Sequence, residues 1–342
     1  MKILLVGYKA ADLTPELLEG DVTCHVLDIY HRHAIEKVHH AKVVCSAHLP
    51  EGPWDVVKFK TGPKLMSGEL SLDLLQEISL LLRSGEDAAS PLSKDRRFHL
   101  DFVGKERDRN DLLNKIKDDP KRVRSFKAEW PASVPGGEKL MFTSYPGCFC
   151  HRRLDEGGLA LAEVVSRDIL KSTEVCACVD LPSDQPTNRP TDQVRNLKIL
   201  DMGCGCGLVG FLIANRLSAL STKHQALSTS LVLVDSHARA VEAATENAAK
   251  FGIEAEVILS DNGTPARMDG TFDVFVGNPP YYSDYRIAEV FLETAKRALK
   301  PGGICYTVVK NAAGLKPVQE RYFPHVEVIG RRGYNVLRSE KE

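Results

Sequence analysis

The chain has 342 residues, of which 43% are hydrophobic and 27% charged, a composition typical of an ordinary soluble globular protein. One hydrophobic core seldom serves so many residues, and the length therefore predicts two domains. The formal net charge of −1 excludes a global electrostatic signal for nucleic acid but leaves a local basic patch open. The apolar run after Met1 is too short for a signal peptide, and no run approaches the roughly 18 residues of a membrane span. We expect a cytoplasmic protein with no membrane partner.

Nine cysteines without a secretion signal indicate reduced thiols rather than a disulfide framework. Three C-x-C pairs raise the question of a metal, but structural zinc sites more often separate their cysteines by two to four residues. We therefore expect no metal. The three pairs are Cys148 with Cys150, Cys176 with Cys178, and Cys204 with Cys206.

Apolar strands alternate with amphipathic helices in the N-terminal part. The predicted strands cover 2–8, 22–30, 54–60 and 98–104, and the predicted helices cover 71–85 and 109–119. This alternation predicts a parallel sheet with helices on its faces. The loops of this half do not form a G-x-G-x-x-G fingerprint. We therefore predict a nucleotide-binding type of fold that lacks nucleotide-binding residues and acts as a scaffold or partner-binding domain.

A basic stretch and a linker close this half. Between Lys105 and Lys127, nine Lys and Arg accompany five Asp and Glu, which fits either a nucleic-acid-facing stripe or a solvated helix surface. Residues 128–139 are rich in Pro and Gly and read as the linker. The predicted domains are therefore 1–127 and 140–342.

A longer strand–helix series follows the linker. The predicted strands cover 139–147, 197–203, 230–236, 254–261, 272–280, 304–310, 325–332 and 334–340, and the predicted helices cover 154–170, 206–220, 238–252 and 285–303. Residues 172–196 are a polar, proline-bearing excursion. The last of these helices has a stripe of period 3.6 that we expect to be buried: Ile287, Val290, Phe291, Thr294, Ala298 and Leu299. The series predicts a doubly wound sheet whose ligands lie beyond the carboxyl ends of its strands.

The stretch DMGCGCG follows the second strand of this series and precedes a helix. Its glycines, Gly203, Gly205 and Gly207, let the backbone turn tightly and let a ligand approach the main chain. The third glycine comes one residue too early for the dinucleotide fingerprint. Asp201, at the strand end, would repel a pyrophosphate but bind a cationic amine. The loop therefore favours S-adenosylmethionine over NAD.

Acidic residues also end the next two strands. Asp235 suits a ribose diol, because a carboxylate can accept two hydroxyl hydrogen bonds. Its separation from Asp201 exceeds the roughly 20 residues of the dinucleotide pattern, and a longer loop at 218–230 accounts for the excess. Asp261 could accept a hydrogen bond from the adenine amino group, with Asn262 beside it. Each residue alone is a weak signal, but acids or glycines at three successive strand ends predict an adenosyl cofactor.

The sequence Asn-Pro-Pro-Tyr follows the next strand, at the same edge of the sheet. A conjugated exocyclic amino group is a poor nucleophile, and an enzyme can help by accepting its hydrogens. The side-chain carbonyl of Asn278 and the backbone carbonyl of Pro279 are two acceptors in one rigid turn, beside the cofactor. Tyr281 could stack on a planar base. This loop predicts a direct N-methyl transfer in which no cysteine acts as a nucleophile.

The order DxGCGxG, acid, SD and NPPY resembles the class I S-adenosylmethionine-dependent amino-methyltransferases. More narrowly, residues 140–338 resemble the catalytic half of bacterial ribosomal RNA guanine-N2 methyltransferases, in particular the 16S type of the ribosomal RNA small subunit methyltransferase C family. The stretch YPGCFCHRRLDEGGLALAE supports this. The resemblance implies methylation of a guanine N2 in ribosomal RNA. It also implies that Phe149, Asp155 and Gly157 line the cofactor or base pocket.

The same resemblance implies an α/β fold class with two Rossmann-like domains. The C-terminal domain would be the class I methyltransferase sheet, and the N-terminal domain a degenerate, cofactor-free copy that binds RNA and supports catalysis. The expected partner is ribosomal RNA or a ribosomal subunit, and the expected state is a monomer.

Other enzymes share the NPPY sequence. The 23S guanine-N2 methyltransferases stay open as the nearest alternative. Protein glutamine N5-methyltransferases usually have a helical N-terminal domain, and DNA adenine-N6 enzymes usually have a target-recognition domain that this sequence lacks. A non-catalytic protein with a relict fold would require decay of the acids or of Asn278, and all of them are intact.

Overall fold

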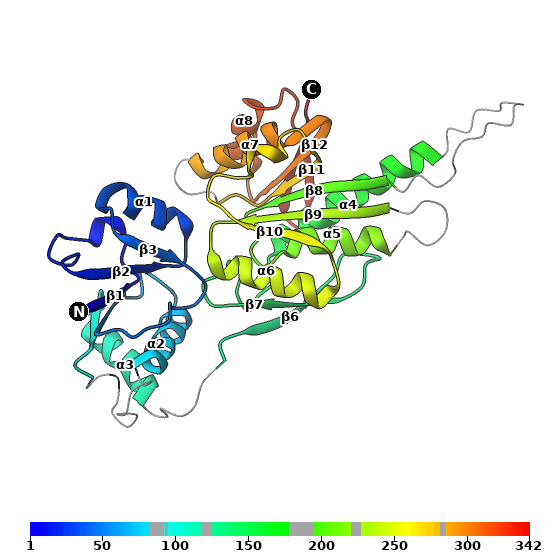
Figure 1. Cartoon of the computed structure of the whole chain (residues 1–342). Helices are drawn as coiled ribbons and strands as arrows, with labels where there is room; N and C mark the ends of the chain where they lie inside the picture. The colour runs from blue at the N-terminus through cyan, green and yellow to red at the C-terminus, as the bar shows by residue number, and fades with distance from the viewer. Residues whose placement is uncertain (83–91, 93–94, 118–124, 178–194, 220–226, 281–284) are drawn as a thin grey trace, which may run out of the picture. The chain divides into compact units, whose positions relative to one another are not determined.

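The structure is a computed structural model, and it describes residues 1–82, 92, 95–117, 125–177, 195–219, 227–280 and 285–342 (Figure 1). The chain divides into two compact units. Unit 1 comprises Met1–Ala128, Ser144–His151 and Ser236–Glu242, and unit 2 comprises Glu129–Thr143, Arg152–Asp235 and Ala243–Glu342. Two short segments of the predicted C-terminal domain thus belong to unit 1.

Unit 1 is built on a five-stranded parallel sheet with the strand order β3-β2-β1-β4-β5 (Figure 1). Its strands are β1 (Lys2–Val6), β2 (Asp21–Val26), β3 (Lys42–Cys45), β4 (Val56–Thr61) and β5 (Phe98–Phe102). Its helices are η1 (Ala10–Asp12), α1 (Ile29–His39), α2 (Gly68–Leu82) and α3 (Glu106–Lys117). Neither α1 nor β3 is predicted from the sequence. Helix α1 buries only Ile35, so its apolar periodicity is weak, and it starts from a side-chain cap by Asp28.

Side chains on both faces of strand β1 are buried in the core of unit 1. Leu4 and Val6 pack with the buried face of α2, whereas Ile3 and Leu5 pack with Ile35 of α1. Alternate residues of a strand point to opposite faces, which explains why this strand reads as a continuous apolar run. Burial of each large aliphatic side chain stabilises the fold by about 1.5–3 kcal/mol.

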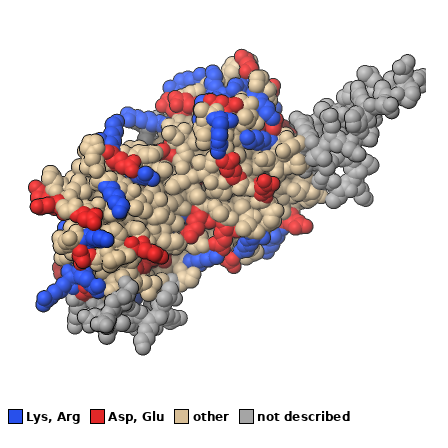
Figure 2. Space-filling view, viewed as in Figure 1, with Lys and Arg blue, Asp and Glu red and all other residues tan. Residues whose placement is uncertain are grey.

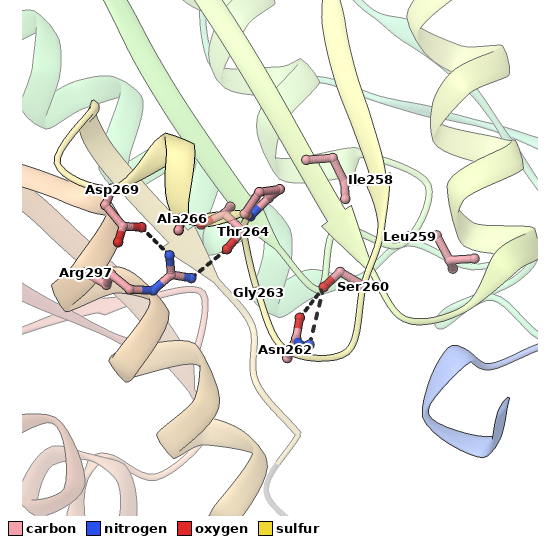
Figure 3. A pocket seen from close by; sticks show the side chains of 10 residues that line it. Ile258, Leu259, Ser260, Asn262, Gly263, Thr264, Ala266, Asp269 and Arg297 are labelled. Carbon is pink, nitrogen blue, oxygen red and sulfur yellow. Dashed lines mark hydrogen bonds and ion pairs between the residues drawn. The ribbon is translucent and has the colours of Figure 1, made fainter. Parts of the chain in front are cut away.

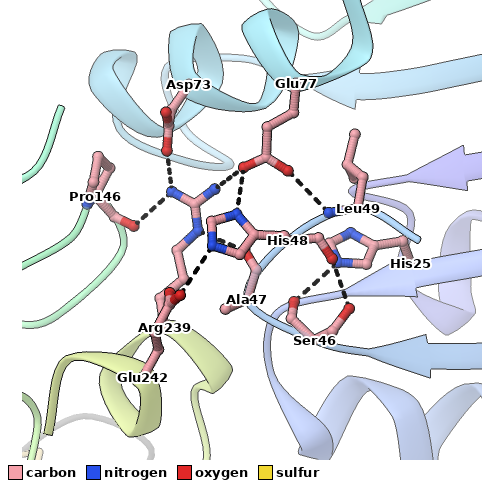
Figure 4. Close-up of polar contacts among 10 residues, drawn as sticks. All are labelled: His25, Ser46, Ala47, His48, Leu49, Asp73, Glu77, Pro146, Arg239 and Glu242. Carbon is pink, nitrogen blue, oxygen red and sulfur yellow. Dashed lines mark hydrogen bonds and ion pairs between the residues drawn. The ribbon is translucent and has the colours of Figure 1, made fainter. Parts of the chain in front are cut away.

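A second stabilising feature of unit 1 is a buried arginine (Figure 4). Arg239 is 1% exposed, and its guanidinium donates to the carboxylates of Asp73 and Glu77 on α2. It also donates to the backbone carbonyls of Ala47 and Pro146, at 3.0 and 3.3 Å. A buried charge is tolerated only when it is paired in this way. The cluster ties the segment Ser236–Glu242 into unit 1.

The stretch that the sequence analysis interprets as a linker begins with a strand. Strand β6 (Ala128–Ala132) pairs with β7 (Leu140–Ser144) in a separate two-stranded sheet. Trp130 stacks on Phe142 with ring centroids 5.2 Å apart, and Phe142 is fully buried. The burial of two aromatic rings outweighs the turn-forming composition of residues 128–139.

Unit 2 is built on a seven-stranded sheet with the order β10-β9-β8-β11-β12-β14-β13, parallel except for β14, which is antiparallel to both of its neighbours. Its strands are β8 (Arg195–Met202), β9 (Leu227–Asp235), β10 (Ala255–Leu259), β11 (Phe272–Gly277), β12 (Leu299–Val309), β13 (Glu327–Arg331) and β14 (Tyr334–Glu340). Its helices are α4 (Glu156–Ala177), α5 (Leu208–Ser218), α6 (Ala238–Phe251), η3 (Ala266–Met268), α7 (Arg286–Ala298) and α8 (Ala312–Glu320). Helix α8 is not predicted. The strand order reverses between β8 and β11, which is where a doubly wound sheet binds its ligand.

Helices α7 and α8 cover one face of this sheet. Phe291, Leu292 and Ala295 of α7 join Leu200 and Phe275 in a single core cluster. The predicted stripe of α7 is rotated slightly, because Ala288, Leu292 and Ala295 are buried while Ile287 and Val290 are only half-buried. On α5, Gly210 lies so close to Leu233 that a Cβ would stand 2.9 Å from that side chain. This close approach brings α5 directly onto the sheet.

The charges show no single-sign surface on the face seen in Figure 2, where Lys and Arg alternate with Asp and Glu. The described parts of the basic stretch are residues 105–117 and 125–127, and within α3 the Nε atom of Arg107 lies 3.9 Å from a carboxylate oxygen of Asp111. Residues 118–124 fall outside the described part, so the choice between an RNA-facing stripe and a solvated helix stays open. Within the described residues, no helix is both long and apolar enough to cross a membrane, and no three His, Cys, Asp or Glu side chains form a group suited to a metal.

Candidate active site

The glycine loop leaves the carboxyl end of β8 at the point where the strand order reverses. Gly203, Gly205 and Gly207 all have positive φ, at 69°, 55° and 85°. A Cβ on Gly203 or Gly207 would stand 2.7 or 2.2 Å from a phenylalanine ring, so those two glycines are required by packing. A Cβ on Gly205 would meet no atom within 4 Å. The loop therefore presents an open cradle at Gly205, as close approach of a ligand to the main chain requires.

Asp235 holds one side of this cradle. It ends β9, the neighbour of β8, and its Oδ2 accepts a hydrogen bond of 2.9 Å from the backbone N–H of Gly205. The carboxylate thus lies at the cradle where the sequence predicts it. A carboxylate that accepts hydrogen bonds, beside a glycine backbone with open space next to it, fits the hydroxyl-rich sugar of an adenosyl group.

Asp201 lies beneath the loop rather than beside the cradle. It is 2% exposed, and its Oδ2 accepts a 2.9 Å hydrogen bond from the backbone N–H of Gly210, near the start of α5. Burial, with smaller contributions from the neighbouring Asp235 and Asp155, raises the pKa of Asp201 to about 7. The position couples the loop to α5, and direct contact of Asp201 with a ligand stays a prediction.

A pocket of about 560 Å³ lies at the carboxyl end of β10 (Figure 3). Ser260 and Asn262 line it, and their side chains are joined by a 2.9 Å hydrogen bond that closes the turn. Arg297 forms its far wall by bonding to Asp269 and to the carbonyl of Thr264. The lining includes the predicted Asn262 but neither Asp261 nor the glycine loop. The pocket is therefore adjacent to the cradle and does not coincide with it.

The proline loop leaves β11, which pairs with β8 in the register Gly277 to Met202. Asn278 and Pro279 therefore emerge from the sheet beside the glycine loop. Both loops rest on Phe291 of α7, since a Cβ added to Gly277 would stand 2.8 Å from that ring. The third predicted catalytic residue, Tyr281, lies outside the described residues.

Asp155, which precedes the first residue of α4, completes the site. Its Oδ2 accepts a 2.9 Å hydrogen bond from Nδ2 of Asn278, and its Oδ1 accepts one of 3.0 Å from the backbone N–H of Gly157. The ring of Tyr334 lies against Gly157, since a Cβ there would stand 3.2 Å from it. The Nζ atom of Lys310 lies over the same Tyr334 ring, 4.3 Å from the ring centroid.

Not every predicted site residue joins this group. Asp155, Gly157, Asn278 and the three loop glycines belong to unit 2, whereas Phe149 belongs to a segment of unit 1 and is 65% exposed. Neither Phe291 nor Tyr334 was predicted to support the site, although Phe291 stands in the predicted buried stripe of α7. In the structure Phe291 supports the two loops, and Tyr334 lies against Gly157.

Comparison with known proteins finds one matching family and several similar proteins. Residues 188–338 match the family described as the methyltransferase small domain. The ribosomal RNA small subunit methyltransferase C of Pseudoalteromonas translucida is 28% identical over 190 residues, which cover 54% of this chain and 45% of that protein. The protein of the same name from Pasteurella multocida is 33% identical over 168 residues, covering 48% of this chain and 40% of the relative. The chain thus spans about half the length of the curated relatives it matches, or less.

A solved structure resembles the chain over its whole length. It is the 16S rRNA N2 methyltransferase RsmC of T. thermophilus, in complex with AdoMet and guanosine. The TM-score is 0.69 at 16% identity, and the match covers 100% of this chain and 88% of that one. At this identity the likeness concerns the fold alone. Residues 188–338 of this chain therefore match the methyltransferase small domain family, and the chain shares the fold of that solved methyltransferase.

Proposed function

We propose that this protein is an S-adenosylmethionine-dependent N-methyltransferase that modifies the exocyclic N2 amino group of a guanine in ribosomal RNA of the small subunit. The observation that carries the proposal is the register between β8 and β11, which brings the glycine loop and Asn278 out of the sheet side by side. The names of the curated relatives, ribosomal RNA small subunit methyltransferase C, support the choice of RNA.

The cradle at Gly205, with Asp235 beside it, would hold the cofactor. S-adenosylmethionine supplies an electrophilic methyl group when it is bound. Asp235 would accept hydrogen bonds from the ribose hydroxyls, and Asp261 with Asn262 would contact the adenine end. Asp201 is included among the cofactor-binding residues through its bond to Gly210, which sets the start of α5.

The substrate amine would be held by oxygen atoms of the proline loop. The side-chain oxygen of Asn278 and the main-chain oxygen of Pro279 are acceptors for its two hydrogens, and they restrict its orientation before the reaction. Pro279 is buried and Asn278 is half-buried, so these groups need little reorganisation. Tyr281 would stack on the base, as predicted.

Unit 1 would support the catalytic unit and bind RNA as a cofactor-free copy of the fold. Its strand order matches that of the first five strands of unit 2. The loop after β1 is closed, since a Cβ on Gly7 would stand 2.4 Å from the carbonyl oxygen of Lys60. We further propose a monomer that acts in the cytoplasm, and analytical ultracentrifugation would test its size.

The test is methyl transfer from tritiated S-adenosylmethionine to 16S RNA, 23S RNA, DNA and protein in parallel, followed by mass spectrometry of the nucleosides. We expect N2-methylguanosine in 16S RNA. Asn278→Ala should abolish transfer and leave the cofactor dissociation constant unchanged, whereas the exposed Asn196→Ala is the matched control that should behave like the wild type. Product in 23S RNA would select the other guanine-N2 class, and N5-methylglutamine would select the protein-modifying class.

A further inference from the structure

The contact between Asp155 and Asn278 points to a role that the cofactor and substrate contacts do not include. Asn278 has one side-chain hydrogen bond among the described residues, and it runs from Nδ2 to Oδ2 of Asp155 at 2.9 Å. Asp155 is itself anchored at the N-terminus of α4 by the backbone N–H groups of Gly157 and Gly158. The amide of Asn278 is therefore held by a group that cannot move independently of α4.

An asparagine amide has a donor end and an acceptor end that differ little in shape. Only the acceptor end can receive hydrogens from a substrate amine, and the donor end would repel them. An ionised carboxylate accepts hydrogen bonds and donates none, so it selects the NH₂ group of its partner. Bonding of Nδ2 to Asp155 leaves Oδ1 of Asn278 available on the opposite side.

We propose that Asp155 is a positioning residue that fixes the orientation of the Asn278 amide, so that its carbonyl oxygen rather than its NH₂ group faces the substrate amine. The inference rests on the proposed function, because it assigns the substrate side of Asn278 to an amine. It also explains why an acid is placed at the start of α4, where a serine or threonine would cap the helix equally well.

The orientation of the Asn278 amide by Asp155 depends on whether the Asp155 carboxylate is protonated, and the surroundings of Asp155 influence that. Burial raises the pKa of Asp155, while the hydrogen bonds from Gly158, Asn278 and Gly157 lower it and the adjacent Glu156 raises it. Asp201 also faces it closely enough to be affected by its charge. Among the cations, Lys310 lies over the Tyr334 ring, and Arg332 pairs with Glu156 at 3.4 Å. Once protonated, Asp155 can donate to Oδ1 of Asn278 and occupy the acceptor that the substrate needs.

A merely structural role for Asp155, as a cap of α4, makes a different prediction. Asp155→Ser keeps a side-chain oxygen for the N-terminus of the helix but is too short to reach Asn278. Asp155→Asn keeps the size and one acceptor but lets the two amides pair in either orientation. If Asp155 only caps the helix, both variants should match the wild type in kcat.

The experiment measures three quantities for the full chain and both variants. The first is kcat on 16S RNA between pH 5.5 and 9, the second is the dissociation constant of S-adenosylmethionine by calorimetry, and the third is the side-chain amide resonance pair of Asn278 in ¹⁵N-labelled protein. We expect Asp155→Ser to lose about 100-fold in kcat, because a misplaced reactive group costs about that much. Its cofactor affinity and melting temperature should stay at the wild-type values.

In the wild type, the Asn278 amide resonances should shift over the same pH range in which kcat falls at acidic pH. In Asp155→Ser, neither the resonance shift nor this acidic fall in kcat should occur. Unchanged kcat in Asp155→Ser, or amide resonances that ignore both pH and the substitution, would overturn the inference. If the wild type methylates none of the substrates, the proposed function fails, whereas the amide resonances still decide whether Asp155 orients Asn278.

Discussion

Asp235 Oδ2 accepts a 2.9 Å hydrogen bond from the backbone N–H of Gly205, and this contact joins the ends of two neighbouring strands at the open side of the glycine loop. The Asp235 carboxylate therefore stabilises the glycine loop in addition to its predicted hydrogen bonds to a ribose. Substitutions at this position must distinguish the loss of the loop contact from the loss of the ribose contact.

Asp235→Ala should weaken the binding of S-adenosylmethionine about 10- to 100-fold, since hydrogen bonds to a charged acceptor contribute about 1.5–3 kcal/mol. Asp235→Asn keeps an acceptor for Gly205 and should lose less. Calorimetry on both variants measures the difference. Glu254→Ala removes an exposed acid between α6 and β10 and serves as the control with an unchanged dissociation constant. Equal affinities for Asp235→Ala and the wild type would remove Asp235 from the cofactor site.

Gly277→Ala should destabilise unit 2 by about 1–3 kcal/mol, because its Cβ would stand 2.8 Å from the Phe291 ring and force the proline loop to move. Chemical denaturation measures the loss. The double variant with Phe291→Leu should recover part of the methyl transfer that Gly277→Ala loses. In Gly330→Ala the new Cβ meets no atom within 4 Å, so this control should unfold like the wild type. A fully active Gly277→Ala protein would show that the two loops do not depend on Phe291.

Asp201→Asn should become more stable than the wild type as the pH rises. Burial raises the pKa of Asp201 to about 7 in the folded protein, above the value of 3.8 for a free aspartate. The folded state therefore binds a proton that the unfolded state releases, so the contribution is present at low pH and is lost as pH rises from about 4 through 7. The substitution keeps an acceptor for Gly210 and removes the charge. The difference in the free energy of unfolding between the two proteins should be larger at pH 8 than at pH 5, because it grows by about 1.4 kcal/mol for each pH unit up to the folded-state pKa of about 7. An equal difference at both pH values would contradict burial of the charge as the cause.

Arg239→Met should lower the free energy of unfolding of unit 1 by about 3–5 kcal/mol, because it leaves Asp73 and Glu77 without their buried partner. Arg32→Met removes the partner of Glu36 on the surface of α1 and should cost less than about 1 kcal/mol. Circular dichroism during urea unfolding compares the two variants. Similar losses of unfolding free energy in the two variants would mean that burial does not strengthen the ion pairs of Arg239.

Much of the fold was predictable because strand and helix periodicities are local properties of the chain. The strands of the seven-stranded sheet and the helices α4 to α7 were all predicted, but two boundaries were wrong. The helix predicted over 285–303 ends at Ala298 and residues 299–303 belong to β12, because Pro301 disfavours the helical conformation of the residue before it. Helix α4 extends to Ala177, inside the excursion predicted over 172–196. Helix α1 escaped prediction because it buries only Ile35, and α8 escaped it because Pro317 stands inside the helix and proline normally indicates a helix end. Strand β6 escaped because Pro and Gly dominate its surroundings, while its stability comes from Trp130 stacking on Phe142, a contact outside the strand itself.

The chemistry proposed for the site is a prediction from the residue types alone. Glycines, acids and the Asn-Pro-Pro turn at successive strand ends are a linear pattern, and a parallel sheet must bring such ends to one edge. Which atoms meet at that edge is seen only in the folded protein. The pairing of Asp155 with Asn278 and the packing of Phe291 against Gly203 join residues far apart in the chain. Hydrogen bonding and close packing act between neighbours in space, and the order of residues carries no direct record of those neighbours.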